Sequence, residues 1–255
     1  MIREKLRNIY LHFVGMYKTP SNSIHILNSH FISAKDSNPE LFRNQLIELS
    51  KQVEFINFED AVSMIVNKET PKTPLVAFTY DDGFEECHSM IAPVLEEFGI
   101  KAAFFINPAF IDGDKVYQSD FVNRKVLTSG KKPLTWEMVI DLKERGHTIG
   151  SHTMDHLRLN INDDAIIEYQ LKKSKEVIEN KISSRCEYFA YPYGQLRDIS
   201  EIALVMAKKH YRYIFSGANY KKYFSNNNQL INRRHAEGNW DINHVKYFLS
   251  TPKTY

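Results

Sequence analysis

Short apolar runs with the composition of β-strands alternate with stretches of helical apolar spacing along most of the chain. The candidate strands span residues 24–28, 54–57, 75–80, 102–107, 148–151, 187–191, 213–216 and 230–233. Such alternation predicts a mostly parallel sheet wrapped by helices. Because the pattern recurs seven or eight times within 255 residues, it favours a single domain built as a (β/α) barrel of seven or eight strands over an open sheet.

The stretches between the strands differ in how clearly they show the apolar spacing of a helix. Residues 39–51 carry one apolar stripe, and residues 163–181 carry another, with Asn162 in the N-cap position. Residues 108–133 break the pattern, because they combine an Asp-Gly-Asp sequence with little periodicity. This segment is either a pocket-forming loop, as barrel enzymes build after their strands, or a surface insertion without a role.

Residues 1–22 form a basic amphipathic segment, which is distinct from a predicted catalytic barrel of residues 23–255. Apolar and basic side chains recur along it at helical spacing: Ile2, Leu6, Ile9, Phe13 and Tyr17, with Arg3, Lys5, Arg7 and Lys18 among them. A helix of this kind either packs against the rest of the domain or lies on an anionic membrane surface. A peripheral membrane contact is therefore one of two expectations for this segment.

The overall charge argues against nucleic acid as a partner. The formal net charge is +2, and the chain lacks the strong basic stripe of nucleic-acid-binding domains. No apolar run reaches the length of about 18 residues that a membrane-spanning helix needs, and the N-terminus lacks the apolar core of a secretory signal. Since Cys87 and Cys186 form no disulfide framework, we expect a cytoplasmic protein with reduced thiols, either free or peripheral to the membrane.

Two adjacent carboxylates follow the apolar run 75–80. Asp81 and Asp82 come at its end, and Gly83 permits a sharp turn away from the strand. In a barrel, this end of the strands is where catalytic groups gather. Because successive residues of an extended segment point in opposite directions, the two carboxylates are expected to have different roles. One can bind a metal ion while the other accepts a proton from metal-bound water, although Asp-Asp-Gly is also a common turn.

Two histidines four residues apart, His152 and His156, follow the run 148–151. On a helical turn, this spacing places both rings on one side. Each ring can then give one nitrogen to zinc at about 2.0–2.1 Å. With one carboxylate from the earlier motif, the pair supplies one oxygen and two nitrogens, which is the minimum equipment for metal-assisted hydrolysis.

A rigid bend follows the run 187–191. Pro192 fixes the backbone between Tyr191 and Tyr193, and Gly194 lets the chain turn. Such a bend can aim a peptide N–H at an oxyanion, while the tyrosine rings can wall a cleft of the size of a sugar. The alternative is a plain strand exit with packed aromatic rings.

Three motifs stand in a fixed order along the chain: Thr-Tyr-Asp-Asp-Gly at 79–83, Ser-His-Thr-Met-Asp-His at 151–156 and Phe-Ala-Tyr-Pro-Tyr-Gly at 189–194. This set resembles the polysaccharide deacetylase family, the carbohydrate esterases that include chitin and peptidoglycan deacetylases. Residues 26–30, Ile-Leu-Asn-Ser-His, are similar to the start of many members. The resemblance covers residues 24–194 and extends more weakly to Trp240.

The resemblance implies a distorted (β/α) barrel, often of seven strands, and a divalent metal that is commonly zinc. It implies that Asp81 is the catalytic base and that Asp82 is a metal ligand. His152 and His156 would complete the metal triad. The backbone N–H of Tyr193 would help to hold the tetrahedral oxyanion.

A further group must protonate the departing amine, because an amide anion leaves very badly. In the family a histidine from a late motif has this role, and His235 is the candidate here. The best-known members also carry an arginine two residues before the proline of the third motif, where this chain has Ala190. We expect Arg233 or Arg234 to take its place from a neighbouring strand end.

Aromatic side chains near the motifs favour a carbohydrate substrate, whose C–H faces stack on rings. The expected substrate contacts are Tyr191, Pro192, Trp136 and Arg234. His30, at the end of the first predicted strand, is a weaker candidate for the same pocket.

Together these features predict a metal-dependent hydrolase that removes the N-acetyl group from an amino sugar in a polysaccharide, glycolipid or sugar precursor and releases acetate, with Zn²⁺ as the expected metal. Two alternatives remain open. One is a hydrolase of another non-peptide C–N bond, such as a cyclic amide, on the same fold. The other is a catalytically inactive glycan-binding barrel, against which the retention of both carboxylates beside the histidine pair argues.

Overall fold

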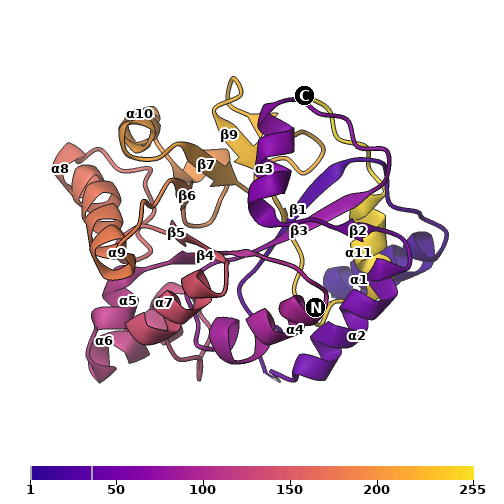
Figure 1. Cartoon of the computed structure of the whole chain (residues 1–255), viewed down its shortest axis with the longest axis horizontal. Coiled ribbons are helices and arrows are strands. Elements are labelled where there is room, and N and C mark those ends of the chain that lie inside the picture. The colour runs from indigo at the N-terminus through magenta and orange to yellow at the C-terminus, as the bar shows by residue number, and fades with distance from the viewer. Residues whose placement is uncertain (1, 36) are drawn as a thin grey trace.

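Seven segments of the chain run parallel to one another around a distorted barrel, as the computed structural model of residues 2–35 and 37–255 shows (Figure 1). In sequence order the strands are β1 (Ile24–Ser29), β3 (Leu75–Tyr80), β4 (Ala103–Ile106), β5 (Thr148–Ser151), β6 (Tyr188–Ala190), β7 (Tyr213–Ser216) and a segment made of β9 (Leu230–Asn232) and β10 (Arg234–His235). The predicted fold class, a single-domain distorted (β/α) barrel, is confirmed. Two short strands, β2 (Glu54–Phe55) and β8 (Phe224–Ser225), lie outside this ring.

The ring is completed by the segment that contains β9 and β10. β9 pairs in parallel with β7, whereas β10 pairs in parallel with β1. Arg233, between the two short strands, donates its backbone N–H to the carbonyl of Ser216 over 2.7 Å. One continuous stretch of chain therefore passes from the last strand of the sheet to the first, and the side chains around Arg233 lie next to those of both.

The two faces of the strands belong to two separate apolar clusters. Side chains such as Val76, Phe78 and Phe104 face outward and pack under helices. Side chains such as Ile26 and Phe105 face inward. Strands that are buried on both faces have nearly continuous apolar sequences, which is why these runs stand out in the sequence.

Helix α3 (Phe58–Val66) closes one end of the barrel. Its Phe58 ring packs 5.2 Å from that of Tyr188, measured between centroids, and Tyr188 is the first residue of β6. The same inner cluster includes Leu75 and Tyr213, which begin β3 and β7. Since α3 fills the end where the strands start, the open end is the one where they finish.

The remaining helices wrap the barrel or lie in its connections (Figure 1). They are α1 (Ile2–Met16), α2 (Pro39–Ser50), α4 (Ala92–Glu97), α5 (Pro108–Asp112), α6 (Lys115–Asp120), α7 (Trp136–Glu144), α8 (Asp164–Glu168), α9 (Ser174–Ile182), α10 (Glu201–His210) and α11 (Ile242–Leu249), with π-helical turns η1 (Cys87–Ile91), η2 (Phe121–Lys125) and η3 (Tyr169–Lys173) and the 3₁₀ turn η4 (Leu196–Asp198).

Side-chain caps fix where several helices begin. Asn38 accepts the backbone N–H of Glu40 and starts α2, as the predicted stripe of 39–51 requires. The predicted cap Asn162 is wrong by one residue. Asp163 is the N-cap of α8, because its Oδ1 accepts the backbone N–H of Ile166 over 3.0 Å. The predicted helix 163–181 is otherwise confirmed, since residues 164–182 are helical without a break and the π-helical turn η3 joins α8 to α9.

The segment 108–133 is more ordered than its sequence suggests. It contains α5, α6 and η2, and its rings of Phe110 and Phe121 stack with centroids 4.0 Å apart. The residues that follow η2 reach the open end of the barrel. Of the two expectations for this segment, a pocket-forming excursion and an insertion without a role, the structure agrees with the first.

Helix α1 packs along α11 through one of its faces (Figure 1). Nδ1 of His12 lies 2.7 Å from Oδ2 of Asp241, and Nε2 of His244 donates to the carbonyl of Asn8 over 2.9 Å. The opposite face leaves Leu6, Ile9, Phe13 and Met16 exposed, and the exposed Tyr17 directly follows the helix. The side chains of Ile2 and Arg3, which belong to the predicted amphipathic pattern, lie outside the described residues, as does Met1. Among the described residues, no helix has both the length and the apolar character to cross a membrane.

Candidate active site

A cavity of about 620 Å³ opens where the barrel strands finish. It is lined by residues that directly follow strands, among them His30 after β1, Asp81 and Asp82 after β3, and His152 after β5. Residues 125–128 of the excursion after β4 form part of its wall. The three motifs of the sequence therefore meet in one hollow, as their positions at strand ends predict.

A left-handed turn at the end of β3 separates the two carboxylates. Asp82 has φ of 72° and Gly83 has φ of 75°, so the backbone reverses as soon as the strand finishes. A Cβ atom at position 83 would lie 3.2 Å from Cγ2 of Ile106, which leaves little room for any residue but glycine. The expectation that Asp81 and Asp82 face different partners holds, although this turn rather than extended backbone turns them apart.

Asp82 faces the histidine pair. Its Oδ1 atom lies 3.4 Å from Nε2 of His152 and 3.3 Å from Nε2 of His156. The spacing of the two histidines predicts a helical turn, but the two rings do not lie on one. A tight turn brings them together, in which Thr153 has φ of 66° and His156 has φ of 61°. Buried Gln170 holds this turn by accepting the backbone N–H of Met154 over 3.0 Å.

These three side chains fit a divalent metal ion. Four ligands placed tetrahedrally at 2.0–2.1 Å from zinc are about 3.3 Å from one another, which matches the two distances to Asp82. Among the described residues, Asp82 Oδ1 is a buried atom without a hydrogen-bond partner. An orphaned buried acceptor is costly unless a ligand satisfies it. One oxygen and two nitrogens form a donor set that suits zinc.

Both imidazole rings are also in a state that leaves one ring nitrogen without a proton, as a metal ligand requires. His152 donates Nδ1–H to the carbonyl of Ala190 over 2.6 Å, which leaves the lone pair of Nε2 facing Asp82. Burial lowers the pKa of His156 to about 4, so its ring is neutral at physiological pH. Burial alone would raise the pKa of Asp82, but His156 and His152 hold it below the usual range, so this carboxylate is ionised.

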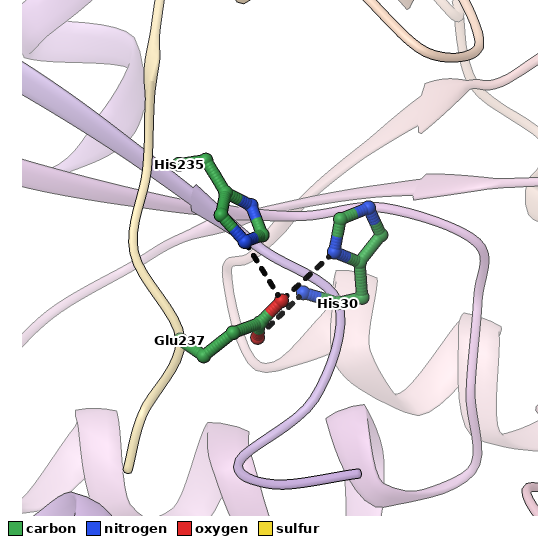
Figure 2. A group of neighbouring side chains, drawn as sticks. All are labelled: His30, His235 and Glu237. Atoms are coloured by element: carbon green, nitrogen blue, oxygen red, sulfur yellow. Dashed lines mark hydrogen bonds and ion pairs between the residues drawn. The ribbon is translucent and has the colours of Figure 1, made fainter. Parts of the chain in front are cut away.

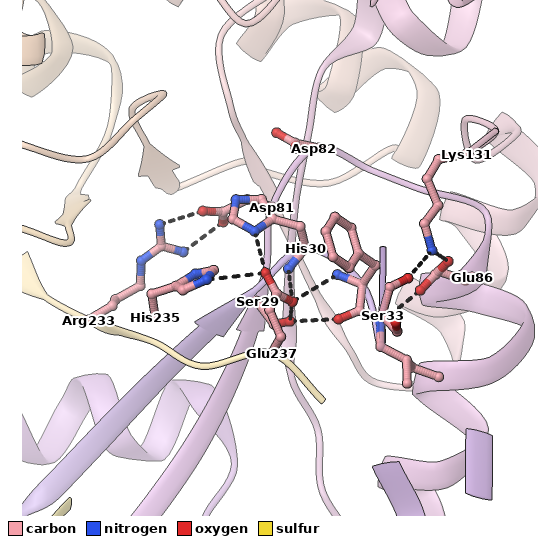
Figure 3. A network of polar contacts seen from close by, with 12 residues as sticks. Ser29, His30, Ser33, Asp81, Asp82, Glu86, Lys131, Arg233, His235 and Glu237 are labelled. Carbon is pink, nitrogen blue, oxygen red and sulfur yellow. Dashed lines mark hydrogen bonds and ion pairs between the residues drawn. The ribbon is translucent and has the colours of Figure 1, made fainter. Parts of the chain in front are cut away.

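Asp81 is clamped by Arg233, which lies in the β9–β10 segment on the other side of β1 (Figure 3). The guanidinium donates Nη1–H to Oδ1 over 2.7 Å and Nη2–H to Oδ2 over 2.8 Å, and both side chains are buried. Below this pair, the guanidinium packs 5.0 Å from the centroid of Phe105. Burial alone would raise the pKa of Asp81, but the charge of Arg233 outweighs it and lowers the pKa.

Arg233, and not Arg234, therefore occupies the place expected for the arginine missing at Ala190. Successive residues of an extended segment point in opposite directions, so only one of the two can enter the barrel. The Arg234 guanidinium lies 3.4 Å from the ring centroid of Phe248, on the outer side toward α11. Arg234 does not line the cavity, contrary to its prediction as a substrate contact.

A third polar group in the cavity consists of His30, His235 and Glu237 (Figure 2). Nδ1 of His30 lies 3.1 Å from Oε1 of Glu237, and Nε2 of His235 lies 3.3 Å from the same oxygen. The other carboxylate oxygen accepts the hydroxyl of Ser29. The second ring nitrogen of His30 points away from Glu237 (Figure 2).

The two histidines of this group differ in charge. Burial alone would lower the pKa of His30, but the hydrogen bond to Glu237 and the charges of Asp82 and Asp81 raise it to about 9. Burial lowers the pKa of His235, the predicted general acid. At neutral pH His30 is therefore the protonated member. The sequence points to His30 only weakly and gives no sign of buried Glu237, which no local pattern distinguishes from other glutamates.

The third motif forms the far wall of the cavity. Tyr193 and Gly194 have φ of 65° and 72°, so the chain bends sharply after Pro192, as predicted. Tyr193 is 48% exposed, and its ring packs 5.0 Å from that of His156. Tyr191 is buried and donates its hydroxyl to the carbonyl of Gly194 over 3.1 Å. Both tyrosines line the cavity, whereas Pro192 is buried away from it.

Trp136 lies apart from this cavity, contrary to its prediction as a substrate contact. It begins α7, packs with the outer apolar cluster and donates its indole N–H to Asp112 over 2.6 Å. Its sequence context is that of an aromatic residue at a helix start, and only the tertiary structure decides which side of the barrel such a residue occupies.

Comparison with known proteins gives a consistent result. A sequence model of the family described as polysaccharide deacetylase matches residues 68–214. The protein YxkH of Bacillus subtilis (strain 168), whose name assigns it provisionally to the polysaccharide deacetylases, is 25% identical over 140 residues, which are 55% of this chain and 44% of YxkH. The chain spans less than half the length of the curated relatives it matches.

Two solved structures share the fold over nearly their whole length. The deacetylase PplD of Streptococcus pyogenes, in complex with acetate, has a TM-score of 0.68 at 20% identity, covering 91% of this chain and 99% of that one. IcaB of Ammonifex degensii has a TM-score of 0.72 at 16% identity, with the same two coverages of 91% and 99%.

Proposed function

Because this chain belongs to the polysaccharide deacetylase family, we propose that it is a metal-dependent hydrolase that removes the N-acetyl group from an amino sugar. The substrate would be a polysaccharide, a glycolipid or a sugar precursor, and the product besides the free amine would be acetate. One observation carries the proposal. One cavity is lined by an ionised carboxylate that an arginine braces, by a second carboxylate that faces two histidines, and by a protonated histidine.

Asp82, His152 and His156 would hold the metal, and we propose zinc. When bound, the ion supplies a Lewis acid for the amide carbonyl and lowers the pKa of its water toward about 7. The residues around it then do the rest of the chemistry. The buried position of all three ligands excludes bulk water from the side opposite the cavity, which strengthens every electrostatic interaction with the substrate.

Asp81 would act as the general base. Its pKa is held low by Arg233, so the carboxylate is ionised and ready to accept the proton of the attacking water. Arg233 also fixes its orientation through two hydrogen bonds. A base that is ionised across the neutral range and cannot rotate is what proton transfer in the attack step requires.

The backbone N–H of Tyr193 would stabilise the oxyanion. Within residues 2–35 and 37–255, this N–H donates to no other group, and it belongs to the left-handed turn that lines the cavity. A preorganised backbone donor costs no reorganisation when charge develops on the carbonyl oxygen.

His30 would donate a proton to the departing amine, in place of His235. Its Nδ1–H hydrogen bond to Glu237 fixes the ring, so the other nitrogen carries the proton that can be transferred. In the metal-free protein the raised pKa of about 9 keeps His30 protonated at neutral pH, whereas burial lowers the pKa of His235. General acid catalysis needs the protonated form, so His30 fits the role better.

The test is acetate release from a panel of N-acetylhexosaminyl substrates, with and without chelator. Native protein should release acetate only when metal is present. Asp81→Asn should slow the reaction by about 10²–10⁴-fold without loss of the metal. His210→Gln is a matched control, because His210 pairs with Glu168 on the surface. Hydrolysis of a cyclic amide alone would refute the deacetylase assignment, and glycan binding without turnover would refute catalysis.

We also propose that α1 makes a peripheral contact with an anionic membrane. Its exposed face carries Leu6 and Phe13, which are 61% and 60% exposed, and Tyr17, which directly follows the helix, is 86% exposed. Lys5, Arg7 and Lys18 lie in the same segment. An apolar face next to basic side chains is the pattern of helices that lie in the headgroup region.

A further inference from the structure

The cavity contains a second set of metal-ligating side chains, His30, His235 and Glu237 (Figure 2). We propose that these three residues bind a second divalent cation, and that an ion held there inhibits the enzyme. The existence of the cation site is independent of the function proposed above. Only the inhibition rests on it.

The geometry of the cluster repeats that of the Asp82 site. Glu237 Oε1 lies 3.1 Å from His30 Nδ1 and 3.3 Å from His235 Nε2, close to the separation of about 3.3 Å between ligands of tetrahedral zinc. The two ring centroids are 5.4 Å apart, compared with 5.1 Å for His152 and His156. One ion could therefore reach all three ligand atoms with small movements of the side chains.

The barrel itself brings the three ligands together. β10 pairs with β1 in a register that places His235 opposite Asn28. The backbone N–H of Ala236 donates to the carbonyl of Asn28 over 2.9 Å and continues the pairing past the strand. His30 and Glu237 each lie two residues beyond that pair, so the parallel chains hold them side by side. The site is part of the ring closure and not of a loose loop.

The surroundings of Glu237 leave one oxygen for an ion. Oε2 accepts the hydroxyl of Ser29 and lies 3.3 Å from the backbone nitrogen of His30. Of the residues that the structure describes, the two imidazoles are the partners of Oε1. A ligating carboxylate whose other oxygen is hydrogen-bonded is oriented in advance. The side chain of His235 is 42% exposed, which leaves a path for the ion and room for water as a fourth ligand.

The donor set selects the kind of cation. Two imidazole nitrogens and one carboxylate oxygen suit Zn²⁺ and related transition metals. Mg²⁺ and Ca²⁺ prefer a shell of oxygens, of which this cluster offers one. We therefore expect binding of Zn²⁺ and Co²⁺ and none of Mg²⁺.

The two sites should fill in order. At the Asp82 site, the ion meets a carboxylate oxygen without a hydrogen-bond partner. At the second site, it must displace the hydrogen bond between His30 Nδ1 and Glu237, and the Nδ1 proton leaves to solvent. Since this exchange costs a favourable interaction, the Asp82 site binds first and the second ion binds more weakly.

An ion at the second site would disable the proposed general acid. Once Nδ1 of His30 binds metal, the ring is neutral and keeps only the proton on its other nitrogen. Both imidazoles on this side of the cavity, His30 and His235, would then be held by the ion, so neither ring would be free to pass a proton to the departing amine. The rate should then fall by about 100-fold or more, which is the usual contribution of a general acid.

The first experiment counts bound ions. Metal-free protein without a histidine tag is dialysed against increasing Zn²⁺, and bound metal is measured per chain. We expect two ions for the native chain and one each for Glu237→Gln, His235→Gln and Asp82→Asn. His210→Gln, which removes a surface histidine paired with Glu168, should still bind two. A single ion in the native chain, two ions in both cluster variants, or none in Asp82→Asn would overturn the proposal.

The second experiment tests inhibition. Acetate release is measured at one equivalent of Zn²⁺ and at a large excess, and the ratio of the two rates is compared between chains. The native ratio should reach about 100 or more. His235→Gln should bring it close to one, and an unchanged ratio in that variant would overturn the inhibitory role. If no substrate is turned over while two ions bind, the cation site stands and the proposed function is refuted.

Discussion

The ionised state of Asp81 depends on Arg233, a residue 152 positions further along the chain. The arginine forms two charge-assisted hydrogen bonds to a buried carboxylate, and its own charge is taken up by that carboxylate. Neither side chain would be stable alone at this depth, because an unpaired buried charge is strongly destabilising. The base of the proposed reaction and its bracing residue therefore form one unit.

Replacing Arg233 with glutamine should change how the reaction depends on pH. Without the guanidinium, the pKa of Asp81 rises, so the acidic limb of the kcat/KM profile should move up by about one to three pH units. Arg234→Gln is the matched control, since that guanidinium lies against Phe248. pH–rate profiles of the two variants decide the matter, and an identical limb in both would contradict the role given to Arg233.

His30 links the cavity to stability. Its pKa is raised from 6.5 to about 9 in the folded protein, so the folded state holds a proton that the unfolded state loses above pH 6.5. The contribution of His30 to the free energy of unfolding of the metal-free protein should therefore be fully present below pH 6.5 and be lost as the pH rises to about 9. Urea unfolding should show that the difference in free energy of unfolding between native protein and His30→Gln shrinks across this range, whereas His210→Gln should follow the native protein. A difference between native protein and His30→Gln that does not change with pH would contradict this role of His30.

At the scale of single elements, short left-handed turns aim the functional side chains. Asp82, His156 and Tyr193 all have positive φ, a conformation that non-glycine residues adopt at a cost. Each follows closely on the end of a strand, so the barrel fixes the start of the turn. The turns thus convert the regular ends of strands into convergent ligands and donors.

Gly83 provides a test of this arrangement. Alanine there combines the left-handed backbone, which costs about 1–2 kcal/mol, with a Cβ atom 3.2 Å from Ile106. Gly99→Ala is the matched control, with φ of 71° and no heavy atom within 4 Å of the added Cβ. Both variants should lose stability, but only Gly83→Ala should also lower zinc affinity, because its turn carries Asp82. Equal zinc affinities, measured by chelator competition, would count against this explanation.

Helix α1 shows how an element can satisfy two expectations at once. One face packs on α11, which is the expectation that the segment belongs to the domain. The other face stays exposed. The membrane contact proposed for that exposed face remains to be tested.

Replacing Leu6 and Phe13 with serine should abolish binding to anionic vesicles while leaving the fold intact, because both side chains are exposed. Ile202→Ser with Val205→Ser removes two exposed apolar side chains from α10 and serves as the control. Co-sedimentation with anionic and neutral vesicles is the measurement. Salt should weaken the binding of the native protein, since it screens the basic residues. Equal sedimentation of both double variants would refute the contact.

At the scale of the whole molecule, the proposed metal joins segments that are distant in sequence. Asp82 follows β3 and the two histidines follow β5, so one ion would tie two barrel strands together. Ligand binding to the folded state alone stabilises it by about 2.7 kcal/mol at 100 times the Kd. For a chain of this size, each kcal/mol raises Tm by about 2–4 °C.

We therefore expect Zn²⁺ to raise Tm by several degrees and a chelator to reverse the change. Thermal unfolding followed by circular dichroism measures both. Asp82→Asn should lose most of the increase, whereas His210→Gln should keep it. An undiminished increase in Asp82→Asn would mean that the stabilising ion binds elsewhere.

Much of this protein is determined by local sequence. The positions of the strands, the barrel class and the carboxylate and histidine motifs all follow from apolar runs, from their spacing and from the residues at their ends. These signals are local because a strand buried on both faces must be apolar, and because only certain residues tolerate a sharp turn. The same local signals leave the cap of α8 uncertain by one residue, since Asn162 and Asp163 have similar capping preferences and the cap is Asp163.

The tertiary structure alone decided which distant side chains meet. Arg233 enters the barrel and Arg234 leaves it because neighbouring residues of an extended segment face opposite sides. Glu237 reaches His30 because β10 pairs with β1 in one particular register, and Trp136 faces away because α7 lies outside the barrel. The register of the strands and the side of the barrel that each side chain faces depend on the packing of the whole barrel. No short stretch of sequence therefore determines them.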